Sequence, residues 1–300
     1  MTKMWKTFLI IPFIIWVSLV SVYGQGEKSG TGKSFLWEIE GTAGKSYLLG
    51  SVHLLKKEHY PLKKTVEDAF EQSDVLAVEA DVSGDKLMSQ GMVLLQKGMY
   101  TGEETLEGNI SPKTYQLAVK KLKELGMDIG GFKKFKPWLL AMTIAQMELV
   151  KLGFSPEYGI EIYFLERASG KKEIAELEGI EFQVKLFDGL SKAESEGFLL
   201  ANIMEADMMG KELDNMIDAW ATGDAKKMER LLTENIQKTP DLDDLYKKLL
   251  DDRNEGMVEK IINYLKSGKT YFIVAGAAHM VGKKGVVQLL EDKGIKTKHL

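Results

Sequence analysis

The 300-residue sequence contains no cysteine, and this absence removes several kinds of site. Without a thiol the protein has no disulfide, no thiolate metal site, no lipid-modified cysteine and no cysteine nucleophile. Histidine is also scarce, with four residues in the whole chain. Any metal ion must therefore be bound by histidine, aspartate or glutamate, and the histidine candidates are few.

The sequence also lacks an excess of basic residues. Its 40 lysines and arginines against 44 aspartates and glutamates give a formal net charge of −4, with the two signs interspersed. This pattern predicts no nucleic-acid partner and no basic surface for anionic lipid. The hydrophobic content of 44% is that of an ordinary globular protein with a sizeable core.

The N-terminus has the layout of a signal peptide. Lys3 and Lys6 precede an apolar run over residues 8–20, and Val22-Tyr-Gly24 offers a small-residue cleavage site. The run contains Pro12 and is shorter than the roughly 20 residues that span a bilayer. We therefore predict that this segment is removed and that the protein is exported to the periplasm, the cell envelope or the medium. An uncleaved membrane anchor is the alternative, and it would be the only contact with a membrane.

The remaining chain reads as a flexible lead-in followed by one domain. Residues 25–34 are rich in Gly, Ser and Lys and lack apolar side chains, which is typical of a linker. Structure is expected over 35–300, with a mainly helical pattern between about 84 and 266 that is interrupted by a strand at 172–178. The clearest helical patterns cover residues 63–72, 136–150, 157–168, 241–266 and 285–293, and an edge strand is expected at 295–300.

Two apolar segments near opposite ends of this domain finish with the same motif. Tyr47-Leu-Leu-Gly-Ser-Val-His53 and Phe272-Ile-Val-Ala-Gly-Ala-Ala-His279 each read as a strand followed by Gly-x-x-His. Short apolar runs bounded by polar residues or glycine indicate strands buried on both faces. Because open α/β sheets bind ligands beyond the carboxyl ends of their strands, we expect both histidines to face one crevice.

Two glutamates end strands of the same kind. Glu79 closes a buried-type strand at 74–79 that follows a short helix, and this succession predicts a parallel crossover that brings Glu79 to the sheet edge of His53. Glu178 closes the strand at 172–178 in a similar way. For Glu178 two interpretations stay open, a second carboxylate at the sheet edge and a solvated strand end.

Two histidines and a strand-terminal glutamate are a suitable set for an open metal site. Imidazole binds zinc, iron, cobalt and manganese, and a carboxylate adds affinity for the harder ions. An open coordination position is what metal-assisted hydrolysis requires. The competing interpretation is that histidines after strands are structural, hydrogen-bonded residues. Ser51 has no base partner that spacing can identify, and His59 and His299 are expected to lie on a polar loop and beside the carboxyl terminus.

Further segments complete a pattern that resembles the TraB/GumN family, which is related to the Tiki-type proteases and to the erythromycin esterase/ChaN-like group. Besides the segments ending in His53, Glu79 and His279, it comprises Lys136-Pro-Trp138, Leu177-Glu178 and Arg253-Asn254. The segments occur in the family's order and cover residues 35–300. The departures are mild: Ser51-Val52 replaces the usual Thr-Ile, and Met280 replaces the usual Leu.

The resemblance implies a fold and a site. The fold is an α/β domain with a central mixed sheet flanked by helices and a large, mainly helical insertion. The site comprises His53, His279 and Glu79 around a divalent metal, with manganese or cobalt favoured over zinc or iron, and Glu79 is either a third ligand or the general base. Arg253 would hold a substrate carboxylate or stabilise the transition state, with Glu178 and Asn254 as supporting or substrate-binding residues.

The leading hypothesis is therefore an exported metal-dependent hydrolase that acts on peptide bonds. A non-catalytic protein that captures a peptide or haem in the same crevice is the alternative, with His53 or His279 as the axial ligand of the haem. In both cases the partner is a peptide or a small molecule.

Overall fold

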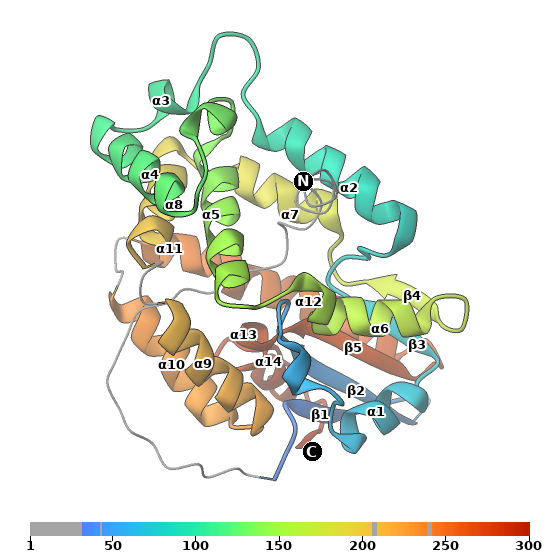
Figure 1. Cartoon of the computed structure of the whole chain (residues 1–300). Helices are drawn as coiled ribbons and strands as arrows, with labels where there is room; N and C mark the ends of the chain where they lie inside the picture. The colour runs from blue at the N-terminus through green and yellow to red at the C-terminus, as the bar shows by residue number, and fades with distance from the viewer. Residues whose placement is uncertain (1–31, 43, 206–208, 239–241) are drawn as a thin grey trace.

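The structure is a computed structural model that describes residues 32–300 except 43, 206–208 and 239–241. Figure 1 shows a sheet flanked by helices and a second group of helices beyond one edge of that sheet. The expected signal peptide and most of the lead-in, residues 1–31, lie outside the described residues, so export stays a prediction. Within the described part of the chain, no helix is both long and apolar enough to cross a membrane.

A mixed sheet of six strands forms the centre of the fold, in the order β4-β3-β5-β2-β1-β6. The strands are β1 (Leu36–Gly41), β2 (Gly44–Ser51), β3 (Val75–Val78), β4 (Glu173–Glu176), β5 (Tyr271–Gly276) and β6 (Thr297–His299). Neighbours among β4, β3, β5 and β2 pair in parallel, whereas β1 pairs antiparallel with both β2 and β6. The predicted mixed α/β sheet, its initial hairpin and its C-terminal edge strand are confirmed.

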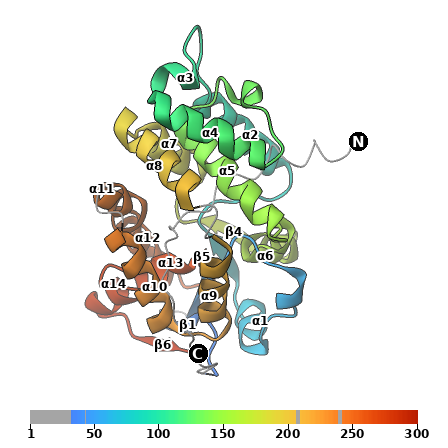
Figure 2. The same ribbon diagram turned by 60° about the vertical axis from the view of Figure 1, so that its left-hand side comes forward.

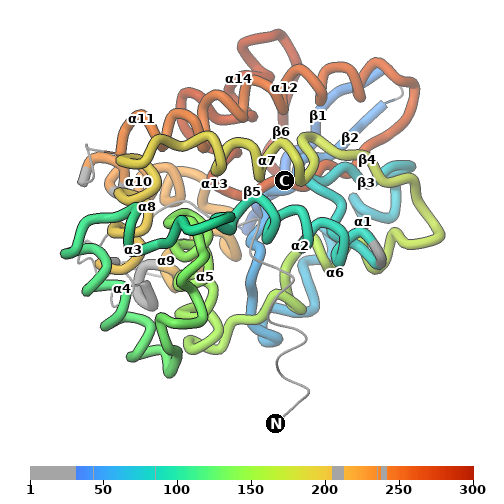
Figure 3. The backbone as a smooth tube through the Cα atoms, turned by 90° about the horizontal axis from the view of Figure 1, so that it is seen from above, coloured from blue at the N-terminus to red at the C-terminus, as the bar shows by residue number. Residues whose placement is uncertain are grey.

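Burial explains why the central strands are continuously apolar. Every residue of β3 and β5 is buried, as expected for parallel strands that are covered on both faces. Figure 3 shows α12 and α14 on one side of the sheet and α1 and α6 on the other. The edge strands β4 and β6 are short, partly exposed and carry charged side chains, which discourages pairing with another chain.

The helices divide into two groups, each with its own hydrophobic core. The sheet core is built with α1 (Lys64–Glu71), α6 (Ile160–Ala168), α9 (Met209–Ala221), α10 (Ala225–Lys238), α12 (Asp252–Leu265), α13 (Ala277–Met280) and α14 (Val286–Asp292). The second core is built with α2 (Gly84–Gly98), α3 (Leu106–Asn109), α4 (Pro112–Glu124), α5 (Pro137–Lys151), α7 (Ile180–Asp188), α8 (Lys192–Glu205) and α11 (Asp243–Tyr246). Short 3-10 helices cover Lys57–His59, Ile129–Phe132 and Pro156–Tyr158.

Helix α5 connects the two cores. It starts with Pro137 at its first position and is buried along most of its length. Its Leu140 and Ile144 belong to the second core, whereas Ala145 and Leu149 pack into the sheet core. Figure 2 shows the second group of helices, including α2, α4 and α8, standing together above the sheet. The site described below lies where the two groups meet.

One predicted helix differs from the structure. The single helix expected over 241–266 is divided into α11, a π-helical turn (η5, Lys247–Asp251) and α12, and residue 241 lies outside the described part. A π-helical turn inserts extra backbone and rotates the following residues around the helix axis, and such turns are frequent at functional sites. Arg253 therefore lies in the first turn of α12, directly after this irregularity, and not in the middle of a regular helix.

Candidate active site at the sheet edge

His53, Glu79 and His279 meet beyond the carboxyl ends of three adjacent parallel strands. Because β5 lies between β2 and β3, the ends of all three strands reach the same edge of the sheet. A Cβ atom placed on Gly276 would lie 3.4 Å from Oε1 of Glu79, 3.5 Å from Cδ2 of His279 and 3.5 Å from Nε2 of His53. The three predicted side chains therefore border one small space, which the missing side chain of Gly276 leaves open.

The imidazole of His279 is oriented by Asn254. Nδ1 of His279 lies 2.6 Å from Oδ1 of Asn254, and Nδ2 of Asn254 donates to the carbonyl of Lys284 at 2.8 Å. Because a carbonyl only accepts, the amide nitrogen of Asn254 must face Lys284 and its oxygen must face His279. Nδ1 of His279 then carries the proton, and Nε2 carries a lone pair. Burial, followed by the charge of Arg253, holds the pKa of His279 well below its usual value, so the ring is neutral.

The imidazole of His53 is held by a buried carboxylate. Nδ1 of His53 lies 2.8 Å from Oε1 of Glu161, although the alignment is too poor for a regular hydrogen bond. The hydroxyl of Ser51 donates to the same oxygen. Burial opposes ionisation of Glu161, but the attraction of His53 and the hydrogen bond from Ser51 outweigh it and lower the pKa of this carboxyl. In the neutral form of the His53 ring, an acceptor beside Nδ1 favours the tautomer whose lone pair is on Nε2.

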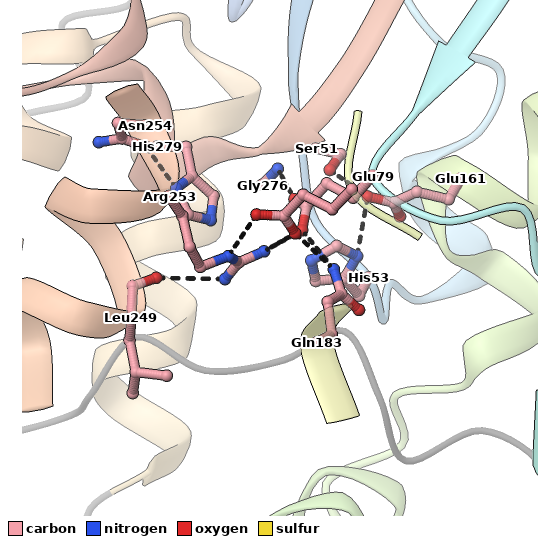
Figure 4. A network of polar contacts seen from close by, with 11 residues as sticks. Ser51, His53, Glu79, Glu161, Gln183, Leu249, Arg253, Asn254, Gly276 and His279 are labelled. Carbon is pink, nitrogen blue, oxygen red and sulfur yellow. Dashed lines mark hydrogen bonds and ion pairs between the residues drawn. The ribbon is translucent and has the colours of Figure 1, made fainter. Parts of the chain in front are cut away.

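The side chain of Glu79 is surrounded by donors. Its Oε1 accepts the backbone N–H of Gly276 at 2.7 Å. Its Oε2 accepts from Nη2 of Arg253 at 2.6 Å and from Nε2 of Gln183 at 3.2 Å. These three hydrogen bonds fix the carboxylate in place, as Figure 4 shows. The carboxylate is thus held rigidly at the border of the space over Gly276.

Arg253 joins the two strand-terminal glutamates. Nε and Nη2 donate to the two carboxylate oxygens of Glu178 at 2.8 and 2.7 Å, Nη2 also donates to Glu79, and Nη1 donates to the carbonyl of Leu249 at 3.1 Å. Burial alone would lower the pKa of Arg253, but the charges of Glu79 and Glu178 raise it above its ordinary value. The guanidinium is therefore charged and committed to its own carboxylates. The side chain of Glu178 is 5% exposed, so its interpretation as a solvated strand end is wrong.

Two residues of this cluster were missed by the sequence reasoning, namely Glu161 and Gln183. Both are buried polar residues on otherwise apolar helix faces. Glu161 shares the buried face of α6 with Ile160 and Phe164, and Gln183 shares that of α7 with residues such as Val184. The available signal was a polar residue at a helix position whose neighbours on the same face are apolar. Such a residue is buried with them and needs a polar partner.

The cluster carries more negative than positive charge. The side chains of Glu79, Glu161 and Glu178 are 3%, 3% and 5% exposed, and Arg253 is the cation among them at 11%. Three carboxylates against one guanidinium leave more acidic than basic side chains in this buried cluster. A buried excess of this kind is unfavourable unless a cation compensates it.

The other candidates have partners outside this cluster or unsuited to catalysis. The hydroxyl of Ser51 is bound to Glu161 and not to an imidazole, so it lacks the arrangement of an activated nucleophile. Nδ1 of His59 contacts the carbonyl of Lys56. The ring of His299 stacks on Trp37, and its Nε2 contacts the carbonyl of Ser34. The structure places neither of these histidines with His53 and His279.

The fold and the cluster define a class of protein, an α/β protein in which two Gly-x-x-His motifs and a strand-terminal glutamate meet over the end of a central parallel strand. The sequence pattern of the TraB/PrgY/gumN family matches residues 35–299 of the chain, and the protein belongs to this family. The match includes every residue of the cluster.

Three bacterial relatives cover most of the chain. It is 26% identical over 256 residues to the uncharacterized protein YbaP of Shigella flexneri, spanning 82% of this chain and 87% of that protein. YbaP of Escherichia coli strain K12 is also 26% identical over 255 residues, with 81% and 87% covered. An uncharacterized protein of Treponema pallidum strain Nichols is 22% identical over 299 residues, with 95% and 88% covered. No solved structure matches the chain.

Proposed function

We propose that this protein is an exported metal-dependent hydrolase that cleaves peptide bonds in the space bordered by His53, Glu79 and His279. One observation carries the proposal more than any other. Nδ1 of each imidazole lies beside an acceptor of the scaffold: Oδ1 of Asn254 forms a hydrogen bond with His279, and Oε1 of Glu161 lies 2.8 Å from Nδ1 of His53. Histidines that bind metals are typically held in this way, because it fixes the tautomer and aims the other nitrogen at the ion.

The residues of the cluster fit a divalent cation. His53 and His279 would hold it through Nε2, and the excess of buried carboxylates over the one guanidinium favours a cation at this place. Among the described residues, no set of three His, Cys, Asp or Glu side chains already stands as a complete metal cage. The reason lies in Glu79, whose oxygens face Arg253, Gln183 and the N–H of Gly276. Nitrogen and oxygen donors of this kind suit manganese, cobalt, zinc and iron.

The bound ion would supply Lewis acidity for the scissile carbonyl and for water. The protein side chains supply the remaining functions. Arg253 holds Glu79 and Glu178 through three hydrogen bonds and is itself anchored by a fourth to the carbonyl of Leu249, so we assign it the role of a positioning residue. With both oxygens engaged by donors, Glu79 has little capacity left to accept a proton. Metal ligation and general-base catalysis both need a free lone pair on Glu79, so either role requires one of these donors to move away.

The same surroundings do not fit haem. A haem pocket needs apolar walls on both sides of the porphyrin. The space over Gly276 is bordered instead by Glu79 and the two imidazoles, and Arg253 and Gln183 both donate hydrogen bonds to Glu79. We therefore do not extend the proposal to haem.

The proposal is tested by peptide cleavage under control of the metal. The protein is stripped with a chelator, reloaded separately with manganese, cobalt, zinc and iron(II), and incubated with a peptide library that is analysed by mass spectrometry. We expect cleavage by at least one reloaded form, and loss of cleavage in His53→Ala. His59→Ala is the matched control, since it removes one imidazole elsewhere in the chain. Stoichiometric peptide binding without cleavage in every metal form would contradict the hydrolase and favour peptide capture.

A further inference from the structure

The amide of Gln183 is satisfied on one side only. Its Nε2 donates to Oε2 of Glu79 at 3.2 Å and to Oε2 of Glu178 at 2.9 Å. Ionised carboxylates only accept hydrogen bonds, so the nitrogen must face them and the orientation of the amide is settled. Its Oε1 is buried, in a side chain that is 3% exposed, and has no hydrogen-bond partner among the described residues.

This oxygen cannot easily find a partner by turning. Rotation of the amide would break both hydrogen bonds of Nε2 and place an oxygen against two carboxylates. Figure 4 shows the amide below His53, with its oxygen turned away from Arg253. Buried acceptors without a partner are rare in native proteins and point to a ligand or an ordered water that completes them. The missing partner of Gln183 must be a hydrogen-bond donor.

We infer that Oε1 of Gln183 accepts a hydrogen bond from the N–H of the scissile amide, and that this contact selects amides over esters. The inference rests on the proposed hydrolase. An amide presents an N–H to the acceptor, whereas an ester of the same shape presents an oxygen whose lone pairs would face those of Oε1. A polar contact of this kind discriminates strongly because the wrong substrate leaves a buried group unpaired.

The chemistry of hydrolysis is compatible with this contact throughout. The oxygen of water forms a bond to the carbonyl carbon, the C–N bond breaks, and the nitrogen leaves as an amine with its own hydrogen and one hydrogen from water. The N–H that contacts Gln183 is therefore present in the substrate, during attack and in the product. A contact with the attacking water is the competing role for Oε1, and it would affect amides and esters alike.

The experiment compares two substrates that differ in one atom. A peptide cleaved by the wild-type protein is paired with the depsipeptide in which the scissile N–H is replaced by oxygen. Gln183→Met removes the acceptor. Gln90→Met is the matched control, because Oε1 of Gln90 on α2 is also buried without a partner among the described residues, while its Nε2 donates to the carbonyl of Asp81 and not to a carboxylate of the cluster. Circular dichroism establishes that each variant is folded.

The expected result is a change in the ratio of the two kcat/KM values. Gln183→Met should lower kcat/KM for the peptide about tenfold more than for the depsipeptide, which is the effect of one hydrogen bond to the reacting group. Gln90→Met should leave this ratio unchanged. Equal losses on both substrates in Gln183→Met would overturn the inference and leave the hydrolase intact. A wild-type protein that cleaves no peptide in any metal form would remove the hydrolase, and the inference with it.

Discussion

Replacing Glu161 should weaken metal binding through His53, although Glu161 does not border the space over Gly276. Its Oε1 lies 2.8 Å from Nδ1 of His53 and also accepts the hydroxyl of Ser51. In Glu161→Gln the amide oxygen can keep both contacts, so this variant removes the charge alone. In Glu161→Leu both donors lose their acceptor, and the imidazole of His53 loses the group that selects its tautomer.

The size of the effect follows from these contacts. Loss of a partner that orients a metal-bound histidine costs about 10–100-fold in metal affinity, and we expect Glu161→Leu to fall in this range. The buried hydroxyl of Ser51, left without its acceptor, costs about 1–3 kcal/mol of stability, offset in part because a buried carboxylate is removed. Glu161→Gln should lose about tenfold or less in affinity, since the acceptor remains.

Two measurements check this prediction. Metal affinity is measured by competition with a chelating dye, and the tautomer of His53 is read from the nitrogen chemical shifts of a protein labelled with ¹⁵N-histidine. Four histidines give a simple spectrum, in which His53→Gln identifies the signal of His53. In the metal-free protein, we expect the imidazole proton of His53 on Nδ1 in wild type and in Glu161→Gln. In Glu161→Leu, we expect it on Nε2 in part of the molecules. Wild-type affinity and an unchanged tautomer in Glu161→Leu would refute the reasoning.

Three further predictions follow from the same structure. Gly276→Ala should lower metal affinity more than tenfold, because the new Cβ occupies the space bordered by His53, Glu79 and His279. The melting temperature should change little, since this Cβ lies at ordinary contact distance from its neighbours. Gly256→Ala is the control and should bind metal normally, because a Cβ there meets no atom within 4 Å. Arg253→Met leaves the carboxylates of Glu79 and Glu178 without their cation, so it should lower the free energy of unfolding, measured in urea, by about 3–5 kcal/mol. A loss below about 1 kcal/mol would contradict the stabilising role of these buried ion pairs. Hydrogen bonds from Lys248 and Ser191 lower the pKa of Glu194 from its ordinary value of 4.5 to about 2. The ion pair between Lys248 and Glu194 therefore stabilises the fold fully at pH values above 4.5, and this contribution is lost as the pH falls towards 2. The difference in melting temperature between wild type and Lys248→Met should therefore shrink over that interval, and a constant difference would argue against the ion pair.

The central part of the site was predictable because it depends on local patterns. A buried strand and its terminal residues can be recognised within a few positions of the chain, and parallel strands bring their carboxyl ends to one edge. That logic was sufficient to place His53, Glu79 and His279 together, as the structure does. The position of β5 between β2 and β3 was not predictable, because strand order depends on pairing between distant segments.

The positions of the supporting residues depend on which face of a helix is buried, and this is harder to predict from the sequence. Glu161 and Gln183 each lie on the buried face of a helix, but only the packed structure shows which polar groups they meet. The position of Arg253 depends in addition on the π-helical turn before α12, for which the sequence carries no plain signal. Its involvement was suggested by the family resemblance, whereas its partners Glu79 and Glu178 come from the structure.

The metal content of the purified protein tests the central claim most directly. The protein is prepared without a histidine tag, reconstituted with manganese, cobalt, zinc or iron(II), desalted and analysed by plasma mass spectrometry. The double variant His53→Ala/His279→Ala is compared with His59→Ala/His299→Ala, which removes the same number of imidazoles outside the cluster. The account predicts close to one equivalent of metal in wild type and in the control, and loss of that metal in the site variant. Absence of bound metal from the wild-type protein after every reconstitution would contradict it.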